Sequence, residues 1–398
     1  CIVFGRNQKP AEDSAIRIAA TLPGGGDLRT MPEESPLWQA LARHHDDVCY
    51  TDERITVADR PRKEMAKWPW NLESASVLTQ AMIGEHANQL LNFLAEPIGY
   101  ACITKGDEIF YQPANLVRRL SPSGEFVLPL TTGETVRNWA NNSGLSLFPY
   151  DEFQEWAVVP LQRLPYQSFL TSLETPLSNR ITFGKAQSER GEWYEYAMVS
   201  PNRLQRQAII TMPEIATHGH ALVLSKPFLA SQTAPVSYLT VDSVALHHLV
   251  AGLLNSSSAL FWLKQVCFNK GAGEDEERDR FVYAGGKVEK LPVPDAIAEA
   301  LRGKSSKLAE RLQAFSQACW ERGRQLPALS AKKLFEKTEE AYHEWNSSLS
   351  GHVSPDPRLG QPFETPEDLK VAFSTACKTR ESLRGEMVAL QEEMDWLV

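Results

Sequence analysis

The stretch VSYLTVDSVALHHLVAGLLNSSSALFWLKQVC, residues 236–267, contains the elements that define the expected fold. Its first five residues form a short strand-like run. Asp242 or Ser243 then caps a helix with one apolar stripe, and Asn255-Ser256-Ser257 interrupts that helix. Residues 260–267 are apolar enough to form a second, buried helix. Upstream, residues 71–160 mix one helix with strand-like runs, and this mixture predicts an α+β fold.

Strand-like runs also recur upstream of this stretch, and Pro, Gly or Ser bounds them. Near the start of the chain, residues 1–5, 16–20 and 54–57 predict strands, with a Gly-rich turn at residues 24–26. One long helix is expected over residues 75–93. The remaining runs are residues 99–104, 108–111, 194–199, 208–212 and 221–225. Together they predict a mixed, β-rich middle region.

The pattern becomes helical after Pro292 and Pro294 and stays so to the end of the chain. Residues 334–345 keep helical spacing, and Thr365-Pro366-Glu367-Asp368 predicts a capped helix start with acids facing the helix dipole. The following residues are spaced four, three, four, three, as in the seam of a coiled coil or an antiparallel helix pair. The seam contains Leu369, Phe373, Ala376, Arg380, Leu383, Met387, Leu390, Met394 and Leu397. We therefore expect a coiled-coil-like helical region at this end.

The composition is that of a globular protein. Of 398 residues, 42% are hydrophobic and 23% are charged, which fits two or three domains. The sequence has no apolar run of membrane-spanning length and no signal peptide at its start, so we expect a cytoplasmic protein without a membrane partner. The six cysteines form no CxxC pair, which favours reduced thiols over a zinc site or disulfides.

The charge is unevenly distributed along the chain. A net charge of −9 argues against binding nucleic acid, since phosphate contacts depend on Lys and Arg. However, residues 161–290 hold 13 basic and 12 acidic side chains, whereas residues 1–160 hold 14 and 21, and residues 291–398 hold 14 and 17. A DNA-binding face would therefore be built mainly from the middle of the chain.

A self-contained active site is not evident in the sequence. The GxGxxG, GxxxxGK[ST], HExxH and GxSxG motifs are missing. The histidine pairs His44-His45, His218/His220 and His247-His248 have no carboxylate or cysteine companions at ligand spacing, so we expect no metal. The acids at residues 274–279 would suit Mg²⁺ in a hydrolase, but such a run is more often a solvated loop. A hydrolase is therefore the last of three hypotheses.

Basic and aromatic residues alternate through the middle region. The series is Arg180, Lys185, Arg190, Trp193, Tyr194, Tyr196, Arg203 and Arg206. Base-edge contacts and phosphate clamps are built from these residue types. The same alternation also arises in a half-buried sheet with an aromatic inner face and Arg on its wet face. Downstream, glycines near Lys270 and Lys287 would permit close approach to a phosphate backbone.

Several stretches, taken in order, carry a resemblance. They are Val3-Phe4-Gly5-Arg6-Asn7, Lys67-Trp68-Pro69-Trp70-Asn71-Leu72, Leu130-Thr131-Thr132-Gly133-Glu134, Leu253-Leu254-Asn255-Ser256-Ser257, Phe261-Trp262-Leu263-Lys264, Tyr283-Ala284-Gly285-Gly286-Lys287-Val288-Glu289-Lys290-Leu291-Pro292-Val293-Pro294 and Ala389-Leu390-Gln391-Glu392-Glu393-Met394-Asp395-Trp396. In combination the sequence resembles the PglX-like adenine-specific DNA methyltransferases of BREX and related phage-defence systems, which are similar in design to type IIG restriction–modification enzymes. Trp68 departs from the His usual in that family.

The resemblance implies a division of the chain into three parts. Residues 1–70 would be the terminal remnant of the methyltransferase domain, 71–294 the DNA target-recognition domain, and 295–398 a helical support. The family methylates adenine N6 with S-adenosylmethionine, using an Asn-Pro-Pro-aromatic motif and a Gly-rich cofactor loop that this sequence lacks. We therefore expect no cofactor in this chain and S-adenosylmethionine in the parent enzyme, with the catalytic half upstream as a partner.

On this reading the chain selects a site in double-stranded DNA while the catalytic half flips out the adenine. The expected reading face consists of Arg180, Lys185, Trp193, Tyr194 and Arg203. The expected phosphate contacts are Arg137, Lys270, Arg280 and Lys287. The main alternative is a non-catalytic interaction module that docks another defence-system protein through the helical seam, and the acidic balance favours it.

Overall fold

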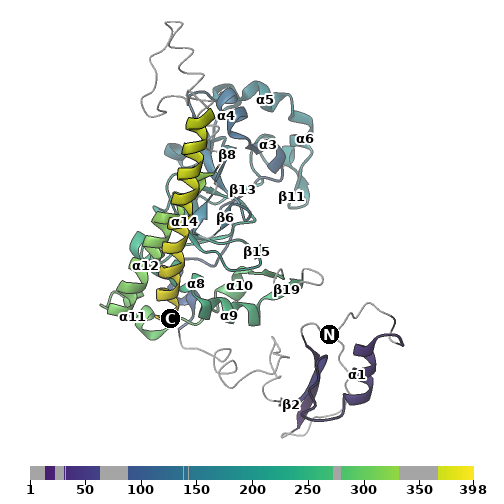
Figure 1. Cartoon of the computed structure of the whole chain (residues 1–398). Coiled ribbons are helices and arrows are strands. Elements are labelled where there is room, and N and C mark those ends of the chain that lie inside the picture. Colours follow the sequence, from purple (N-terminus) through teal and green to yellow (C-terminus); the bar gives the residue numbers. More distant parts are fainter. Residues whose placement is uncertain are drawn as a thin grey trace. The chain divides into compact units, whose positions relative to one another are not determined.

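The computed structural model describes residues 14–22, 31, 33–62, 88–137, 139–141, 143–271, 279–330 and 366–398. Helices and short strands alternate along the chain, and a long helix lies at the C-terminal end (Figure 1). The expected α+β class is therefore confirmed. The chain divides into two compact units: Cys1–His86 with Lys264–Val266 and Gly271–Asp279, and Ala87–Leu263 with Cys267–Lys270 and Arg280–Val398.

The first unit contains a strand pair and one helix. Strands β1 (Ala15–Thr21) and β2 (Ile55–Pro61) pair antiparallel, as expected for two of the three runs. Helix α1 (Pro36–His44) begins after Ser35, whose side chain accepts a hydrogen bond from the Trp38 amide. Its core is small and consists of Leu37, Ile55 and Val57 with Ala40, Leu41 and Tyr50. The expected strand at residues 1–5 and the turn at 24–26 lie outside the described residues.

The second unit contains three sheets of three or four strands. The first has the order β16 (Leu222–Ser225), β14 (Ala208–Thr211), β18 (Val236–Ser237). The second has the order β17 (Leu229–Ala230), β5 (Val127–Thr131), β8 (Gly144–Leu147), β4 (Tyr111–Gln112). The third has the order β15 (Ile215–Ala216), β20 (Arg280–Val282), β19 (Phe268–Gly271). Strands β17 and β5 pair in parallel. Antiparallel pairs are β14 with β16 and with β18, β15 with β20, and β8 with β4 and with β5.

Short two-stranded pairs and small helices complete this unit. The pairs are β3 (Cys102–Ile103) with β13 (Met198–Val199), β6 (Val136–Arg137) with β7 (Ala140–Asn141), β9 (Tyr150–Asp151) with β10 (Ala157–Val158), and β11 (Ile181–Thr182) with β12 (Lys185–Ala186). The small helices are η2 (Leu90–Phe93), α3 (Asp107–Phe110), α4 (Ala114–Leu120), η3 (Glu152–Gln154), η4 (Leu161–Arg163), α5 (Gln167–Thr171), α6 (Glu174–Ser178), η5 (Gln187–Glu189), α7 (Pro201–Leu204), α10 (Gly285–Val288) and η7 (Pro327–Leu329).

The core of the second unit is rich in aromatic side chains. Phe110, Phe148, Tyr150 and Tyr196 contact one another edge-to-face or tilted, with ring centroids 4.8–5.7 Å apart. The Tyr196 hydroxyl reaches the Leu147 carbonyl at 2.6 Å, which satisfies its buried polar group. The aromatic residues of the middle region therefore serve the core in large part, as the sheet interpretation of the alternation predicts.

The expected helical pair is present at its expected place. Helix α8 (Val244–Asn255) is capped by Ser243, and helix α9 (Ser257–Val266) by Ser256. Asn255 connects the pair to a sheet, because its side-chain amide exchanges two hydrogen bonds of 2.8 Å with the backbone of Ala221. Helix α8 is buried almost throughout, which explains its continuous apolar sequence.

The C-terminal helices form an antiparallel pair. Helix α11 (Asp295–Leu301) leads into α12 (Lys307–Gly323), which packs on α8 and on α14 (Pro366–Asp395). Arg322 pairs with Glu386 at 2.7 Å and Arg311 with Glu393 at 3.6 Å, so α12 and α14 run in opposite directions. The seam residues Ala376, Met387 and Met394 are buried. The second of the two expected seam arrangements is therefore the one observed.

Other expectations differ from the structure or fall outside it. Residues 108–111 were expected to form a strand, but residues 107–110 form helix α3, because the Thr104 hydroxyl bonds to both Asp107 and the Gly106 amide and so starts a turn. Most of the helix expected over residues 75–93, and the helix over 334–345, lie outside the described residues. The domain boundary at residue 70 also lies outside them, and the boundary at 294 falls within the second unit and stays a prediction.

Within the described part of the chain, no single helix is long and apolar enough to cross a membrane. The helices α8 and α9 meet those length and composition criteria only as a pair, and they are bent by 64° at their junction.

Candidate DNA-binding surface

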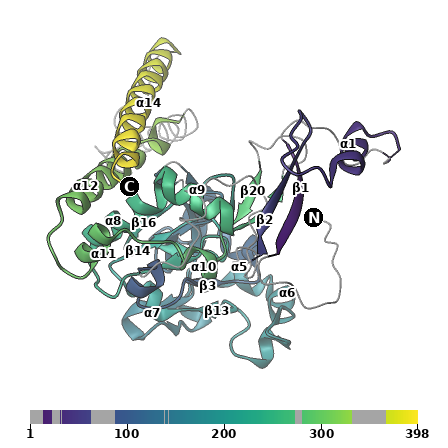
Figure 2. The ribbon, with the colours of Figure 1, turned by 90° about the horizontal axis from the view of Figure 1, so that it is seen from below.

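The sheet β15–β20–β19 brings together three of the expected phosphate contacts. Lys270 lies on β19, Arg280 on the neighbouring strand β20, and Lys287 on helix α10, which follows β20. Lys270 and Arg280 are exposed, and Lys287 is half-buried. Figure 2 shows α10 and β20 in the same region of the second unit. The pairing of β19 with β20 thus places Lys270 and Arg280 on neighbouring strands.

Helix α10 is fixed against the start of the second unit. A Cβ atom at Gly285 would lie 3.0 Å from the Ile98 side chain, so only glycine fits this approach. The Glu289 carboxylate accepts a 2.7 Å hydrogen bond from the Ile98 amide. The position of Lys287 is therefore set by the fold rather than by a loose loop.

Arg137 lies outside this sheet, on β6 of the β6–β7 pair. It is an exposed residue of β6 that donates to the Gly133 carbonyl and to the Val136 carbonyl. Burial, followed by the charge of Arg137, lowers the pKa of His220 to about 4. The charge of Arg137 therefore lies near His220, four residues after β15 ends.

Arg180 occupies a buried position instead of a reading face. Its side chain donates to the carbonyls of Leu177 at 3.0 Å, Trp193 at 2.9 Å and Glu195 at 2.6 Å, and also to that of Thr104. The residue is 9% exposed, and burial lowers the pKa of its guanidinium. A guanidinium whose donors bond to backbone carbonyls fixes local structure, so we omit Arg180 from the proposed DNA surface.

Arg203 is placed in a similar way. It donates to the Val236 carbonyl at 2.9 Å and to the Pro97 carbonyl at 2.8 Å, and it lies 3.5 Å from the Glu96 carboxylate. The residue is buried. Its guanidinium joins strand β18 to the segment that opens the second unit, and we omit it from the DNA surface for the same reason.

The two aromatic members of the expected reading face pack toward the interior. Tyr194 is buried and donates a 3.0 Å hydrogen bond to the Val159 carbonyl. Trp193 is half-buried, contacts the core cluster and meets the Tyr194 ring edge-on at 5.2 Å. Sequence reasoning could not separate these roles, because aromatic residues are used both in cores and at interfaces.

Lys185 is the member of the expected reading face that is exposed. It begins β12, directly after a two-residue turn that joins β11 to β12. The turn also exposes Phe183, and Arg190 lies with its guanidinium carbon 5.2 Å from the centre of the Phe183 ring. Phe183 was not singled out from the sequence. The signal was the Phe183-Gly184 dipeptide, since glycine after a strand-like residue marks a tight turn.

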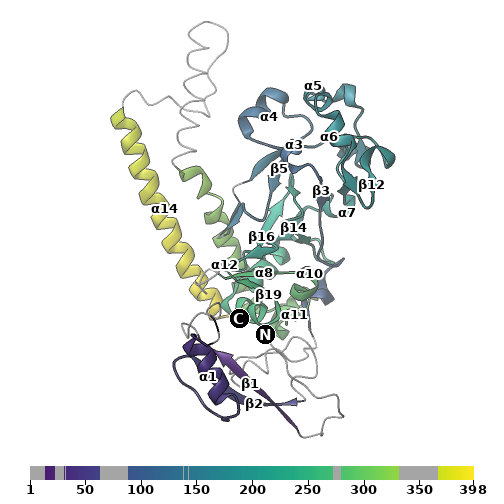
Figure 3. The same cartoon turned by 90° about the vertical axis from the view of Figure 1, so that its right-hand side faces the viewer.

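Two elements of the second unit, the β11–β12 hairpin and the β15–β20–β19 sheet, carry exposed cations named above. In Figure 1 the β11 hairpin and the β15 and β19 strands lie on the side away from α12 and α14, and Figure 3 shows this side facing the viewer. Lys185 belongs to the hairpin, and Lys270 and Arg280 belong to the sheet.

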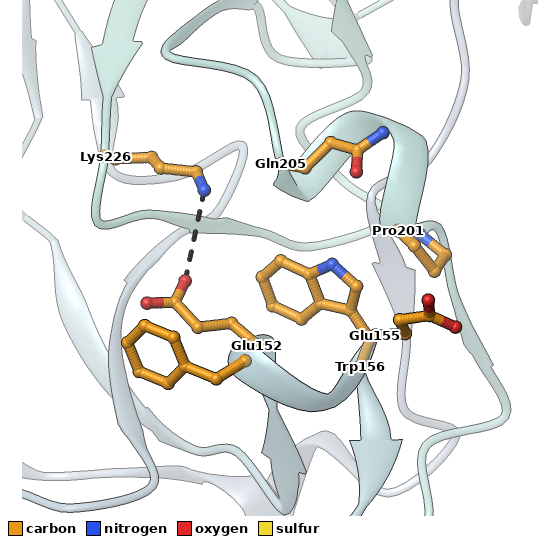
Figure 4. A pocket seen from close by; sticks show the side chains of 7 residues that line it. Glu152, Glu155, Trp156, Pro201, Gln205 and Lys226 are labelled. Carbon is orange, nitrogen blue, oxygen red and sulfur yellow. Dashed lines mark ion pairs between the residues drawn. The ribbon is translucent and has the colours of Figure 1, made fainter.

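A separate cavity of about 640 Å³ has a different character (Figure 4). Its lining consists of Glu152, Phe153, Glu155, Trp156, Pro201, Gln205 and Lys226. The Lys226 ammonium lies 4.0 Å from the Glu152 carboxylate and 6.0 Å from the centre of the Trp156 ring. Two carboxylates and one lysine give this cavity an acidic rim, which disfavours phosphate.

Metal-binding or nucleophilic chemistry has little support in the described residues. They include no group of three or more His, Cys, Asp or Glu side chains suited to a metal ion. Burial raises the pKa of Cys102, Cys267 and Cys319 to about 12, so these thiols are poor nucleophiles at neutral pH. The acids at residues 274–277 lie outside the described residues.

The chain is similar in sequence to a known adenine-specific methyltransferase. No family model matches the chain. The chain is 26% identical, over 412 aligned positions, to the adenine-specific methyltransferase PglX of Streptomyces coelicolor. The chain is a distant homologue of PglX. The match covers 100% of this chain and 30% of PglX, so the chain spans less than a third of that relative's length.

A solved structure is also similar in part. It is the Type IIL restriction-modification enzyme MmeI in complex with DNA, with a TM-score of 0.38 and 13% identity. The likeness covers 82% of this chain and 37% of that one. The sequence match to PglX confirms, as a distant relationship, the resemblance to PglX-like proteins expected from the sequence motifs.

Proposed function

We propose that this chain is the DNA target-recognition part of an adenine-N6 DNA methyltransferase of the PglX type that acts in phage defence in the cytoplasm. The distant homology to PglX provides the enzyme class. The sequence has no Asn-Pro-Pro-aromatic motif, so the methyl transfer from S-adenosylmethionine is assigned to a catalytic part that these residues do not include. This chain would hold and select the duplex, and other defence proteins are possible partners of the whole enzyme.

One observation carries the proposal: in an otherwise acidic chain, Lys270 and Arg280 are exposed on neighbouring strands of one sheet. Lys287 is half-buried on α10, which follows β20, and Arg137 is exposed on β6. Phosphate contacts of this kind position a protein on duplex DNA. The nine residues expected from the sequence remain predictions as DNA contacts, and our proposal retains Arg137, Lys185, Lys270, Arg280 and Lys287.

Charge reversal tests this proposal. We expect Lys270→Glu with Arg280→Glu to weaken binding of a labelled duplex at least about tenfold at low salt, because two phosphate contacts become repulsive. Fluorescence anisotropy measures the affinity. The matched control is Lys304→Glu, an exposed lysine between α11 and α12, which should leave affinity within about twofold of wild type. Equal affinities for all three proteins would contradict the proposal.

The interaction-module alternative has less support from the geometry. Docking through the helical seam needs an available apolar face. Ala376, Met387 and Met394 are already buried in this chain, whereas Phe373 of the same seam is 44% exposed. A partner that used these residues would have to displace α14 from α12, which costs the burial of three apolar side chains.

A further inference from the structure

The hairpin β11–β12 presents two large apolar side chains to solvent. Ile181 is 64% exposed and Phe183 is 73% exposed. Thr182 pairs with Lys185 across the hairpin, so the turn consists of Phe183 and Gly184 alone. Their φ angles are 49° and 83°, as in a type I′ turn. The Phe183 ring therefore lies at the tip of a tight hairpin.

Phenylalanine is an unfavourable residue at this turn position. A left-handed φ places the Cβ atom close to the backbone, and type I′ turns prefer Asn, Asp or Gly there. Phe183 bears that cost and, being exposed, gains little from burial in the core. Other non-glycine residues of the described chain also have positive φ, but Phe183 combines this conformation with a 73% exposed ring, and that combination points to a role in binding.

Buried polar residues fix both ends of the hairpin. Arg180 precedes β11, and four backbone carbonyls hold its guanidinium. Gln187 follows β12, is 1% exposed and donates its backbone N–H to the Arg180 carbonyl at 2.8 Å. The tip is thus presented from a rigid base, and a ligand that binds there does not have to order the hairpin.

Positive charges accompany the ring. The Arg190 guanidinium lies over the Phe183 ring at 5.2 Å and donates one hydrogen bond, to the Ala197 carbonyl at 3.1 Å. Lys185 is exposed next to the turn. Glu189 and Glu192 flank Arg190 in the sequence and are exposed as well. An exposed aromatic ring between two cations suits a partner with apolar, stackable groups between phosphates, and duplex DNA has this chemistry.

We propose that the Phe183 ring contacts a base step of duplex DNA as a wedge, while Lys185 and Arg190 contact the flanking phosphates. This inference rests on the proposed function and specifies which element probes the bases. Arg180, which the sequence had suggested as a base reader, instead positions the element that does so. The ring is uncharged, so its contribution to affinity is independent of salt.

The test uses Phe183→Asn in the full chain. Asparagine is favoured at this turn position, so the variant should be at least as thermally stable as wild type while lacking the ring. We expect it to bind a fluorescein-labelled, random-sequence duplex pool about 5- to 100-fold more weakly, with an unchanged dependence on salt. Phe153→Asn is the matched control, because Phe153 is 91% exposed at the acidic cavity. The control should bind like wild type.

A second readout locates the contact. A photoreactive phenylalanine analogue at position 183 should crosslink to the duplex, whereas the same analogue at position 153 should not. If wild type binds DNA with salt dependence and Phe183→Asn binds equally well, the wedge is overturned and the proposed function stands. If wild type shows no salt-dependent binding, both are overturned. Crosslinking from position 183 to a second copy of the chain, with none to DNA, also overturns the wedge.

Discussion

Arg180 and Arg190 belong to one basic and aromatic segment, yet the fold uses them differently. Arg180 is buried and donates to four carbonyls, whereas Arg190 is exposed beside the Phe183 ring. Residue type alone does not distinguish these roles, because the difference arises from contacts with distant segments such as that of Thr104. At the residue scale, the sequence therefore predicts which residue types form the candidate site. It does not predict which of these residues are buried and which are exposed.

Replacement of Arg180 should affect stability. We expect Arg180→Ala to lower the free energy of unfolding by about 2–4 kcal/mol, because several buried carbonyls lose their donor. Urea denaturation followed by circular dichroism measures this change. Lys185→Ala, at an exposed position in the same segment, should change stability by less than about 0.5 kcal/mol. Similar losses in the two variants would contradict the structural role of Arg180.

His248 should make the protein sensitive to acid. Burial, with a smaller effect of His247, lowers the pKa of His248 to about 4, from an ordinary value of 6.5. Its neutral form is therefore favoured by folding, so the stability it provides is complete above about pH 6.5 and is lost as the pH falls toward 4. The expected loss is about 2–3 kcal/mol.

Denaturation across this pH range, compared with His248→Phe, isolates the effect. The phenylalanine keeps a ring against Trp320, whose centroid lies 5.1 Å from that of His248. The variant should lose less stability than wild type between pH 6.5 and 4. An identical pH profile would show that other groups cause the loss.

At the scale of elements, sequence periodicity predicted an element correctly where its capping and breaking residues agree with the pattern of buried residues. Helix α8 begins after Ser243 and ends at Asn255, as the cap and the break predict. The strand expected over residues 108–111 was wrong, because a side-chain turn at Thr104 overrides the alternation there. The hairpin at Phe183 was missed since its strands have only two residues each, which is too short for a periodic signal.

The pairing of α12 with α14 gives a prediction for the helical region. Met394 is fully buried, so Met394→Ala should destabilise the chain by about 2–4 kcal/mol. Val388 on the same helix is 57% exposed, and Val388→Ala should cost less than about 0.5 kcal/mol. Thermal unfolding of both variants measures the difference. Equal midpoints would mean that α14 does not pack as described.

At the scale of the whole molecule, stretches that carry the resemblance to PglX-like proteins hold the second unit together. Residues near the start of this unit bond to the Leu291–Val293 region: the Leu90 amide donates to the Leu291 carbonyl, and the Val293 amide to the Asn88 carbonyl. Gln391 donates from α14 to the Asn255 carbonyl at 2.9 Å. These stretches thus supply hydrogen bonds between distant segments of the unit. The exposed Lys185, Lys270 and Arg280 are the residues that we propose to contact DNA.

The central claim is that the second unit binds duplex DNA through exposed cations, although the whole chain has a net charge of −9. The most direct measurement is the affinity of the chain for a labelled duplex over a series of salt concentrations. We predict that log affinity falls linearly with log salt, and that Lys270→Ala with Arg280→Ala reduces the slope by about two. Absence of binding at low salt, or a slope that the double variant leaves unchanged, would contradict the account.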